Sequence, residues 1–128
     1  MIAKEMNKKG DWGSTWTKKL LDELELGKRN SQVGENLVFE NRFVKIWTIH
    51  LPPQGKLPFH KHDKPYVYIA HNDGISRSYI DNGEVQEVTY QRGDTKYLPS
   101  LDKENPLIHN LINIGCTALI FTTIEFKQ

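Results

Sequence analysis

The sequence predicts an all-β protein, either a sandwich or a barrel of short strands. After residue 40, short segments rich in β-branched and aromatic residues alternate with glycine, proline and Asn-Gly turns. Little of the chain has the spacing of an amphipathic helix. Closely spaced short strands with turns between them are typical of sandwiches and barrels. At 128 residues the chain is long enough for one modest core.

The chain begins with a polar and partly helical segment. Residues 1–14 are expected to be poorly ordered. From Trp16 to Leu26, apolar side chains recur at helical spacing, and Gly27 ends the pattern. We therefore divide the chain into an N-terminal extension with a short helix, residues 1–36, and a β-barrel domain, residues 37–128. The apolar face of the helix must be buried on its own barrel or on a neighbouring subunit, so we expect a homodimer.

Strand signals and turn signals alternate through the second segment. A run rich in branched and aromatic residues ends at Pro52 and Pro53. Asp81, Asn82 and Gly83 predict a hairpin turn. The predicted strands are Arg42–Leu51, Lys56–His62, Tyr66–Ala70, Ser76–Ile80, Glu84–Tyr90, Thr95–Leu98, Ile108–Ile114 and Ala118–Phe126.

Composition limits the classes of partner. With 17 basic and 16 acidic residues the net charge is +1, which gives no indication of nucleic acid or an anionic membrane as a partner. We expect a small molecule instead. Cys116 is the only cysteine, which excludes an intrachain disulfide framework and fits a reducing compartment. The N-terminal segment has no uninterrupted apolar run and the most apolar segment, 118–124, is too short to cross a membrane, so we expect a cytoplasmic protein.

Three histidines suggest a metal site. His60 and His62 are separated by one residue, and His109 follows in a later strand. Side chains two apart in a strand share a face and lie roughly 6.5 to 7 Å apart, so the pair can converge on one ion. A third imidazole completes a facial set for a borderline divalent metal, with open positions for water or substrate. A lone His-x-His pair is a weak signal of metal binding, because surface strands often have polar residues at alternate positions.

From Gly55 to Asn113 the sequence resembles the two motifs of the cupin superfamily. The first motif has a glycine, a His-x-His pair, a glutamate and a second glycine, and the matching residues are Gly55, His60, His62, Tyr66 and Gly74. The second has a glycine, a proline, a histidine and an asparagine, matched by Gly93, Pro99, His109 and Asn113. The resemblance implies a double-stranded β-helix, or jelly roll.

Two departures from the family pattern bear on the chemistry. Tyr66 stands where the family usually has a metal-binding glutamate, and the turn between Pro99 and His109 is longer than the family pattern. A neutral phenol does not ordinarily replace a carboxylate ligand, so three neutral imidazoles would leave the metal its full charge. Such a site prefers an anionic chelating substrate, for example an enolate, a carboxylate or a thiolate. The Tyr66 hydroxyl can donate to that substrate or act in acid and base catalysis, or the ring can be a wall of the site.

Three further side chains are candidates for substrate binding. Tyr68 has the same parity as Tyr66. Arg77 can bind a carboxylate through two N–H groups, although a strand arginine is also typical of a solvated surface. Asn113 shares a strand face with His109 and can make a polar contact nearby.

The resemblance implies a mononuclear site in which His60, His62 and His109 bind a divalent metal, with Fe²⁺ favoured and Zn²⁺, Ni²⁺ or Mn²⁺ as alternatives. Three-histidine members of the superfamily include dioxygenases of thiols or diketones, and isomerases and lyases of sugars and uronates also occur. We therefore expect a metal-dependent enzyme, favouring a dioxygenase acting on a small anionic metabolite. The alternatives are a non-catalytic binding or sensing protein, a sugar or uronate isomerase or lyase, and a metal-free jelly roll with vestigial histidines. Fold alone does not choose between them.

Overall fold

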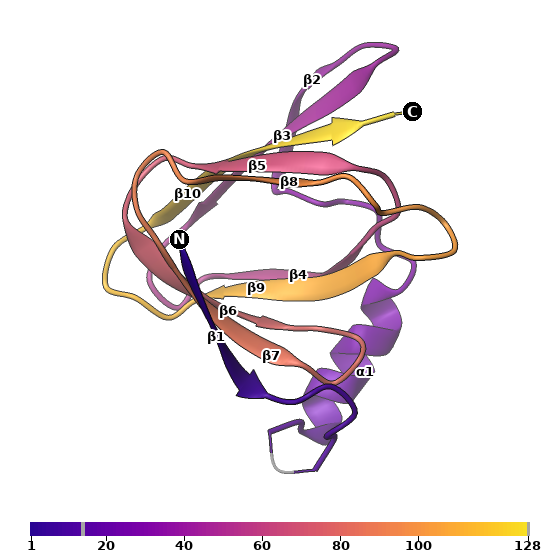
Figure 1. The fold of residues 1–128 in the computed structure, drawn as a ribbon, viewed down its shortest axis with the longest axis vertical. Helices are drawn as coiled ribbons and strands as arrows, with labels where there is room; N and C mark the ends of the chain where they lie inside the picture. The colour runs from indigo at the N-terminus through magenta and orange to yellow at the C-terminus, as the bar shows by residue number, and fades with distance from the viewer. Residues whose placement is uncertain (14, 128) are drawn as a thin grey trace.

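The structure, a computed structural model, describes residues 1–13 and 15–127. In this part of the chain, ten strands and one helix follow one another (Figure 1). They are β1 (Ile2–Asn7), α1 (Lys18–Gly27), β2 (Asn36–Glu40), β3 (Val44–Leu51), β4 (Lys56–His62), β5 (Tyr66–Ala70), β6 (Gly74–Tyr79), β7 (Val85–Tyr90), β8 (Thr95–Leu98), β9 (Leu107–Asn113) and β10 (Leu119–Phe126). No helix in these residues is long and apolar enough to span a membrane.

The strands form two antiparallel sheets that face each other (Figure 1). The first sheet has the order β1-β7-β6-β9-β4, and the second has the order β2-β3-β10-β5-β8. Strands far apart in the sequence are neighbours, as in the pairs β4 with β9 and β3 with β10. This is the predicted double-stranded β-helix. The expectation of a closed barrel is wrong, because the strands form two separate sheets.

The inner faces of the two sheets pack on each other. In β10 alternate residues are buried, as expected for a strand with one face in the core. The core between the sheets contains Ile49, Leu51, Leu57, Ala70, Tyr90, Leu111, Leu119 and Phe121.

The helix α1 covers the outer face of the first sheet beside β4 and β9 (Figure 1). The Thr17 side chain accepts a hydrogen bond from the Leu20 amide at 3.2 Å and caps its N-terminus. Leu24 and Trp16 are buried with Phe59 in a second apolar cluster. The apolar face of the helix is thus buried on its own sheet, which removes the reason to expect a partner subunit there; the homodimer stays a prediction.

The sequence predicted most strands but missed two. Lys56–His62, Tyr66–Ala70 and Thr95–Leu98 have the predicted bounds. The expected poor order of residues 1–14 is wrong for β1, which pairs with β7, while Ser14 lies outside the described residues. β1 and β2 are both edge strands with mostly exposed side chains, so they lack the apolar alternation of a half-buried strand. The domain boundary at residue 36 stays a prediction.

We expect Gly27→Ala to lower the free energy of unfolding by about 3 kcal/mol, because a methyl group there overlaps backbone that cannot rotate away. The added carbon would overlap Phe59 Cβ and lie 2.7 Å from the Phe59 carbonyl oxygen. The gain in helix propensity, about 1 kcal/mol, is smaller. Urea unfolding measures the change, with Gly115→Ala as the control because its nearest neighbour would be an ordinary 3.5 Å away. Equal stability of wild type and Gly27→Ala would contradict the close approach of α1 to β4.

Candidate metal centre and pocket

Three histidines from neighbouring strands lie together on the inner face of the first sheet. His60 and His62 are on β4, and the antiparallel register places His60 directly opposite His109 on β9. One potential ligand atom from each of the three lies within 4.8 Å of those of the other two. The cluster is therefore compatible with a divalent metal site.

An irregularity in β4 gives His60 and His62 their direction. Leu57 pairs with Leu111, but the next pair is His60 with His109, so β4 has one more residue than β9 between the two pairs. Such a bulge changes which face the following residues occupy and is common near functional sites. Leu57 and His60, three residues apart, consequently both face the interior. Pro58 lies inside this bulge, where the missing amide proton breaks no regular ladder bond.

The segment after α1 holds the outer edge of β4, which is an edge strand of the first sheet. The Lys61 amide donates to the Asn30 carbonyl at 2.7 Å, and Asn30 Nδ2 donates to the Phe59 carbonyl at 3.0 Å. These two hydrogen bonds fix the backbone on both sides of His60. The N-terminal extension therefore supports the histidine pair from outside.

Hydrogen bonding fixes the tautomer of one ring. His60 Nδ1 lies 2.8 Å from the Pro58 carbonyl oxygen, an acceptor, so Nδ1 carries the proton and Nε2 presents its lone pair. His60 Nε2 lies 3.1 Å from His62 Nε2. Among the described residues, His62 Nδ1 and His109 Nε2 are buried without a hydrogen-bond partner. Ring nitrogens gathered this closely in a buried site suit a single cation. The backbone acceptor behind His60 is the support that metal-bound histidines usually have.

Burial keeps the three rings uncharged. It lowers the pKa of His60 to about 4. It also holds the pKa values of His62 and His109 well below their usual range, and the neighbouring rings lower them further. Near pH 7 all three imidazoles are therefore neutral, which is the form that binds metal.

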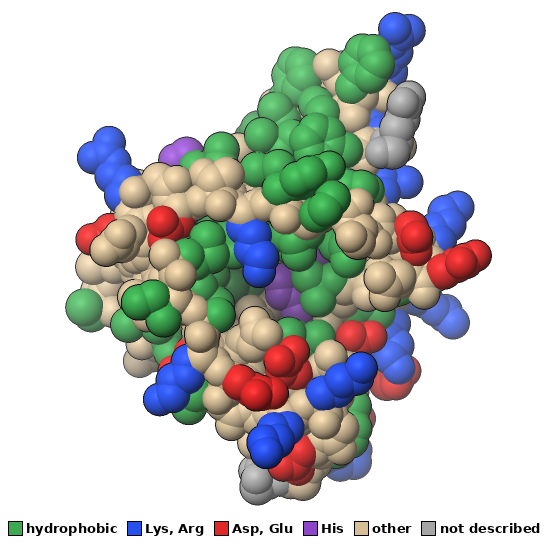
Figure 2. Space-filling model, in the orientation of Figure 1, with side chains coloured by type: hydrophobic (Ala, Val, Ile, Leu, Met, Phe, Trp, Pro, Cys, Tyr) green, Lys and Arg blue, Asp and Glu red, His purple; other side chains and the backbone are tan. Residues whose placement is uncertain are grey.

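The histidines line a cavity of about 330 Å³ between the two sheets. Figure 2 shows its opening as a hollow in which histidine atoms are visible among hydrophobic side chains. The apolar part of the wall includes Leu57, Leu111 and Phe121. The volume matches that of small-molecule sites.

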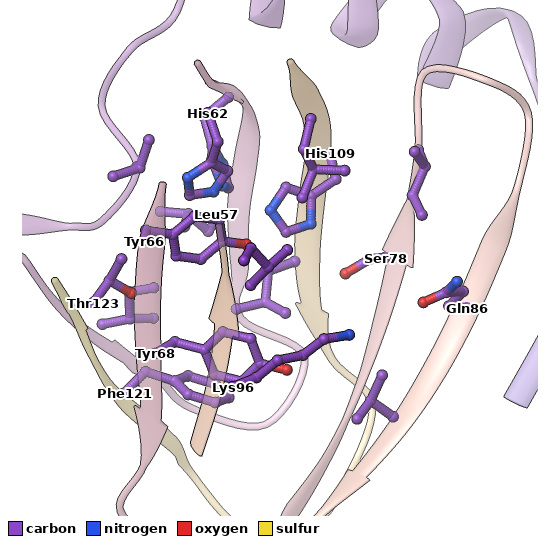
Figure 3. Close-up of a pocket in the computed structure, with 18 of the residues that line it drawn as sticks. Leu57, His62, Tyr66, Tyr68, Ser78, Gln86, Lys96, His109, Phe121 and Thr123 are labelled. Carbon is purple, nitrogen blue, oxygen red and sulfur yellow. The ribbon is translucent and has the colours of Figure 1, made fainter. Parts of the chain in front are cut away.

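Tyr66 lies against the histidine cluster from the second sheet. Its ring stacks on His62 with centroids 4.0 Å apart and an interplanar angle of 10°. In Figure 3 its hydroxyl points into the cavity. Burial raises the pKa of Tyr66, so the phenol is protonated and can act as a donor. Tyr68, also predicted, lines the cavity and its hydroxyl donates to Met1 Sδ at 3.1 Å.

The structure does not bring Arg77 or Asn113 to the cavity, which corrects the expectation of a substrate contact for either. The Arg77 Nη2 and Nε groups donate to Glu87 Oε2 at 2.6 and 3.0 Å, on the face of β6 opposite Ser76 and Ser78. Asn113 is fully buried, and its Nδ2 group donates to the carbonyls of Leu51 and Thr117 at 3.0 and 2.8 Å. Asn113 therefore ties chain segments together.

Glu125, on β10, faces the interior. It is 7% exposed and lies opposite Tyr66 in the β10–β5 pair. Trp47 Nε1 donates to Glu125 Oε1 at 3.4 Å, and burial raises the pKa of the carboxyl group. Glu125 does not line the cavity.

Three polar residues that the sequence analysis passed over do line the cavity: Ser78, Gln86 and Lys96. Ser78 lies opposite Gln86 in the β6–β7 pair, and Lys96 lies opposite Tyr68 in the β5–β8 pair. Lys96 could have been placed in the cavity from its pairing with Tyr68, because directly paired residues share a face of the sheet. That pairing is not visible in the sequence.

No protein-family model matches the sequence, and no curated protein matches it. The structure is similar to a cupin domain from Bordetella pertussis, with a TM-score of 0.64 and 25% identity over 80% of this chain and 100% of that chain. An RmlC-like cupin family protein with a double-stranded β-helix fold, from Methanocaldococcus jannaschii, has a TM-score of 0.57 and 19% identity over 77% of this chain and 84% of that one. A cupin superfamily protein from Desulfitobacterium hafniense has a TM-score of 0.54 and 15% identity, over 78% and 82%. By its fold, the chain is therefore a double-stranded β-helix protein of the cupin superfamily.

Proposed function

We propose that the protein is a metal-dependent cupin in which His60, His62 and His109 bind one divalent metal ion and a small anionic molecule binds that ion from the cavity. The convergence of three neutral imidazoles on the wall of an open cavity of about 330 Å³ carries the proposal. Ferrous iron is the favoured metal, and zinc, nickel and manganese suit the same ligands. A bound ion would act as a Lewis acid and hold the substrate in the cavity.

The ligand set explains the preference for an anion. Three neutral imidazoles bring no charge to the site, and Tyr66, in the position of the family's glutamate, is protonated because burial raises its pKa. The charge of a divalent ion must then be balanced by what binds to it. A carboxylate, an enolate or a thiolate meets this requirement, and the Tyr66 hydroxyl is placed to donate a hydrogen bond to it.

Among reaction classes we favour a dioxygenase. A facial set of three ligands leaves open positions for substrate and a second small molecule. The apolar side chains of Leu57, Leu111 and Phe121 on the cavity wall would help to shield reactive species from water. An isomerase or lyase of sugars or uronates is the less favoured enzyme class. A binding or sensing protein is the non-catalytic alternative; a cytoplasmic location and a homodimer remain part of the proposal.

Purification without chelator should yield protein with close to one equivalent of divalent metal. His60→Ala and His109→Ala should each lose most of it, because two imidazoles remain. Elemental analysis of folded variants measures the content. His50→Ala is the matched control, since His50 is exposed on β3 and lies outside the cluster. Wild-type protein without metal, both as purified and after reconstitution, would contradict the proposed site.

Ferrous-loaded protein should consume dissolved oxygen when given small thiols, diketones or aromatic diols, and an oxygen electrode measures the uptake. Metal-free protein is the control. A binding protein would instead show a ligand-dependent rise in Tm without oxygen uptake, because a ligand stabilises the folded state by mass action. Product formed under argon would identify an isomerase or lyase and would rule against the oxygenase.

Tyr66→Phe should leave the metal content unchanged and lower turnover by about tenfold or more, because it removes only a hydroxyl donor. Tyr66→Glu should hold the metal more strongly against a chelator and weaken the binding of an anionic ligand, because it adds a negative oxygen ligand. Tyr97→Phe is the control, since Tyr97 is 57% exposed on β8 and lies outside the cavity.

Either of two results would contradict the assigned role of Tyr66. Loss of metal from Tyr66→Phe would mean that the tyrosine itself is a ligand. Unchanged metal retention and activity in Tyr66→Glu would mean that the side chain does not reach the metal.

A further inference from the structure

One part of the cavity wall has a polar character that the metal site does not use. Lys96 extends from β8 across the cavity toward the side where Ser78 and Gln86 lie (Figure 3). Ser78 and Gln86 are direct partners in the β6–β7 pair, so their side chains are neighbours on the same face. The three residues come from both sheets and offer an ammonium group, a hydroxyl group and a carboxamide to the same space.

The Lys96 ammonium group is available to an anion. Within residues 1–13 and 15–127 it forms no ion pair with a carboxylate, and it is the one lysine or arginine side chain lining the cavity. Met1 also lines the cavity, but its ammonium group pairs with Asp94 Oδ2 at 2.9 Å. Among the described residues that line the cavity, Glu84 is the one with a carboxylate, and it forms no ion pair with Lys96.

The register of β5 places the backbone of Lys96 two residues along the cavity from the position of Tyr66. Tyr66 stacks on His62, and Tyr68, two residues along the same face, lies opposite Lys96. Two residues of strand span roughly 6.5 to 7 Å. The apolar side chains of Leu57 and Phe121 line the same cavity. The cavity therefore has one cation-binding site at the histidines, a cation at Lys96 and apolar wall beside them.

We propose that Lys96, together with Ser78 and Gln86, binds a second anionic group of the substrate. The substrate class is then a small dianion, such as a dicarboxylate with a short carbon chain. One anionic end would bind at the histidine site, and the other would pair with the ammonium group. This inference rests on the proposed metal site and adds to it the charge and length of the substrate.

Isothermal titration calorimetry of zinc-loaded protein tests the inference without oxygen chemistry, using glutarate and adipate against pentanoate and hexanoate. We expect the dicarboxylates to bind about tenfold more tightly than the monocarboxylates of the same length, because a charge-assisted hydrogen bond is added. Lys96→Met should remove that preference. Lys96→Arg should restore it.

Lys4→Met is the matched control. It removes the same charge from an exposed residue of β1. Ala3, the neighbour of Lys4, lines the cavity but Lys4 does not, so Lys4→Met should keep the dicarboxylate preference. Zinc content is measured in every sample. Wild type that takes up no zinc overturns the proposed metal site and this inference with it. Fully loaded wild type that does not bind dicarboxylates, or binds them no better than monocarboxylates, overturns only the role of Lys96, as does an unchanged preference in Lys96→Met.

Discussion

The pairing of β4 with β9 places His60 and His109 side by side across two strands, and every other feature of the site depends on this register. A shift of one residue would turn the histidines of one strand away from the cavity. The bulge after Leu57 is what aligns the His-x-His pair with the interior. Because β4 is an edge strand, nothing in the first sheet itself fixes its outer side; Asn30 does so, through hydrogen bonds to Phe59 and Lys61.

The N-terminal extension is therefore part of the support of the site as well as a cover for the core. Gly27 allows α1 to approach the backbone of Phe59 more closely than any side chain would permit. Phe59 in turn is 1% exposed beneath Trp16 and precedes His60 directly. The buried face of the helix and the position of the first histidine are thus set by the same contacts.

The sequence predicted what depends on local pattern and on motif spacing. Strands with one buried face were recognisable from their alternation, and His60, His62 and His109 from their order in the chain. The edge strands β1 and β2 were not, because an exposed strand has no such alternation. Arg77 and Lys96 show the limit most clearly. Both are strand cations, and only the pairing of β6 and β8 with their neighbours reveals that Lys96 faces the cavity and Arg77 faces Glu87.

Charge balance connects the two halves of the cavity. The first sheet supplies three imidazoles that burial keeps neutral, and the second sheet supplies Tyr66, a phenol that burial keeps protonated. None of these groups carries a negative charge that could offset a divalent ion. In a buried site such an offset would be worth far more than at the surface, so under the proposed metal binding the anion would have to come with the ligand. Lys96 lines the same cavity, and its proposed role would raise the number of negative groups on the ligand from one to two.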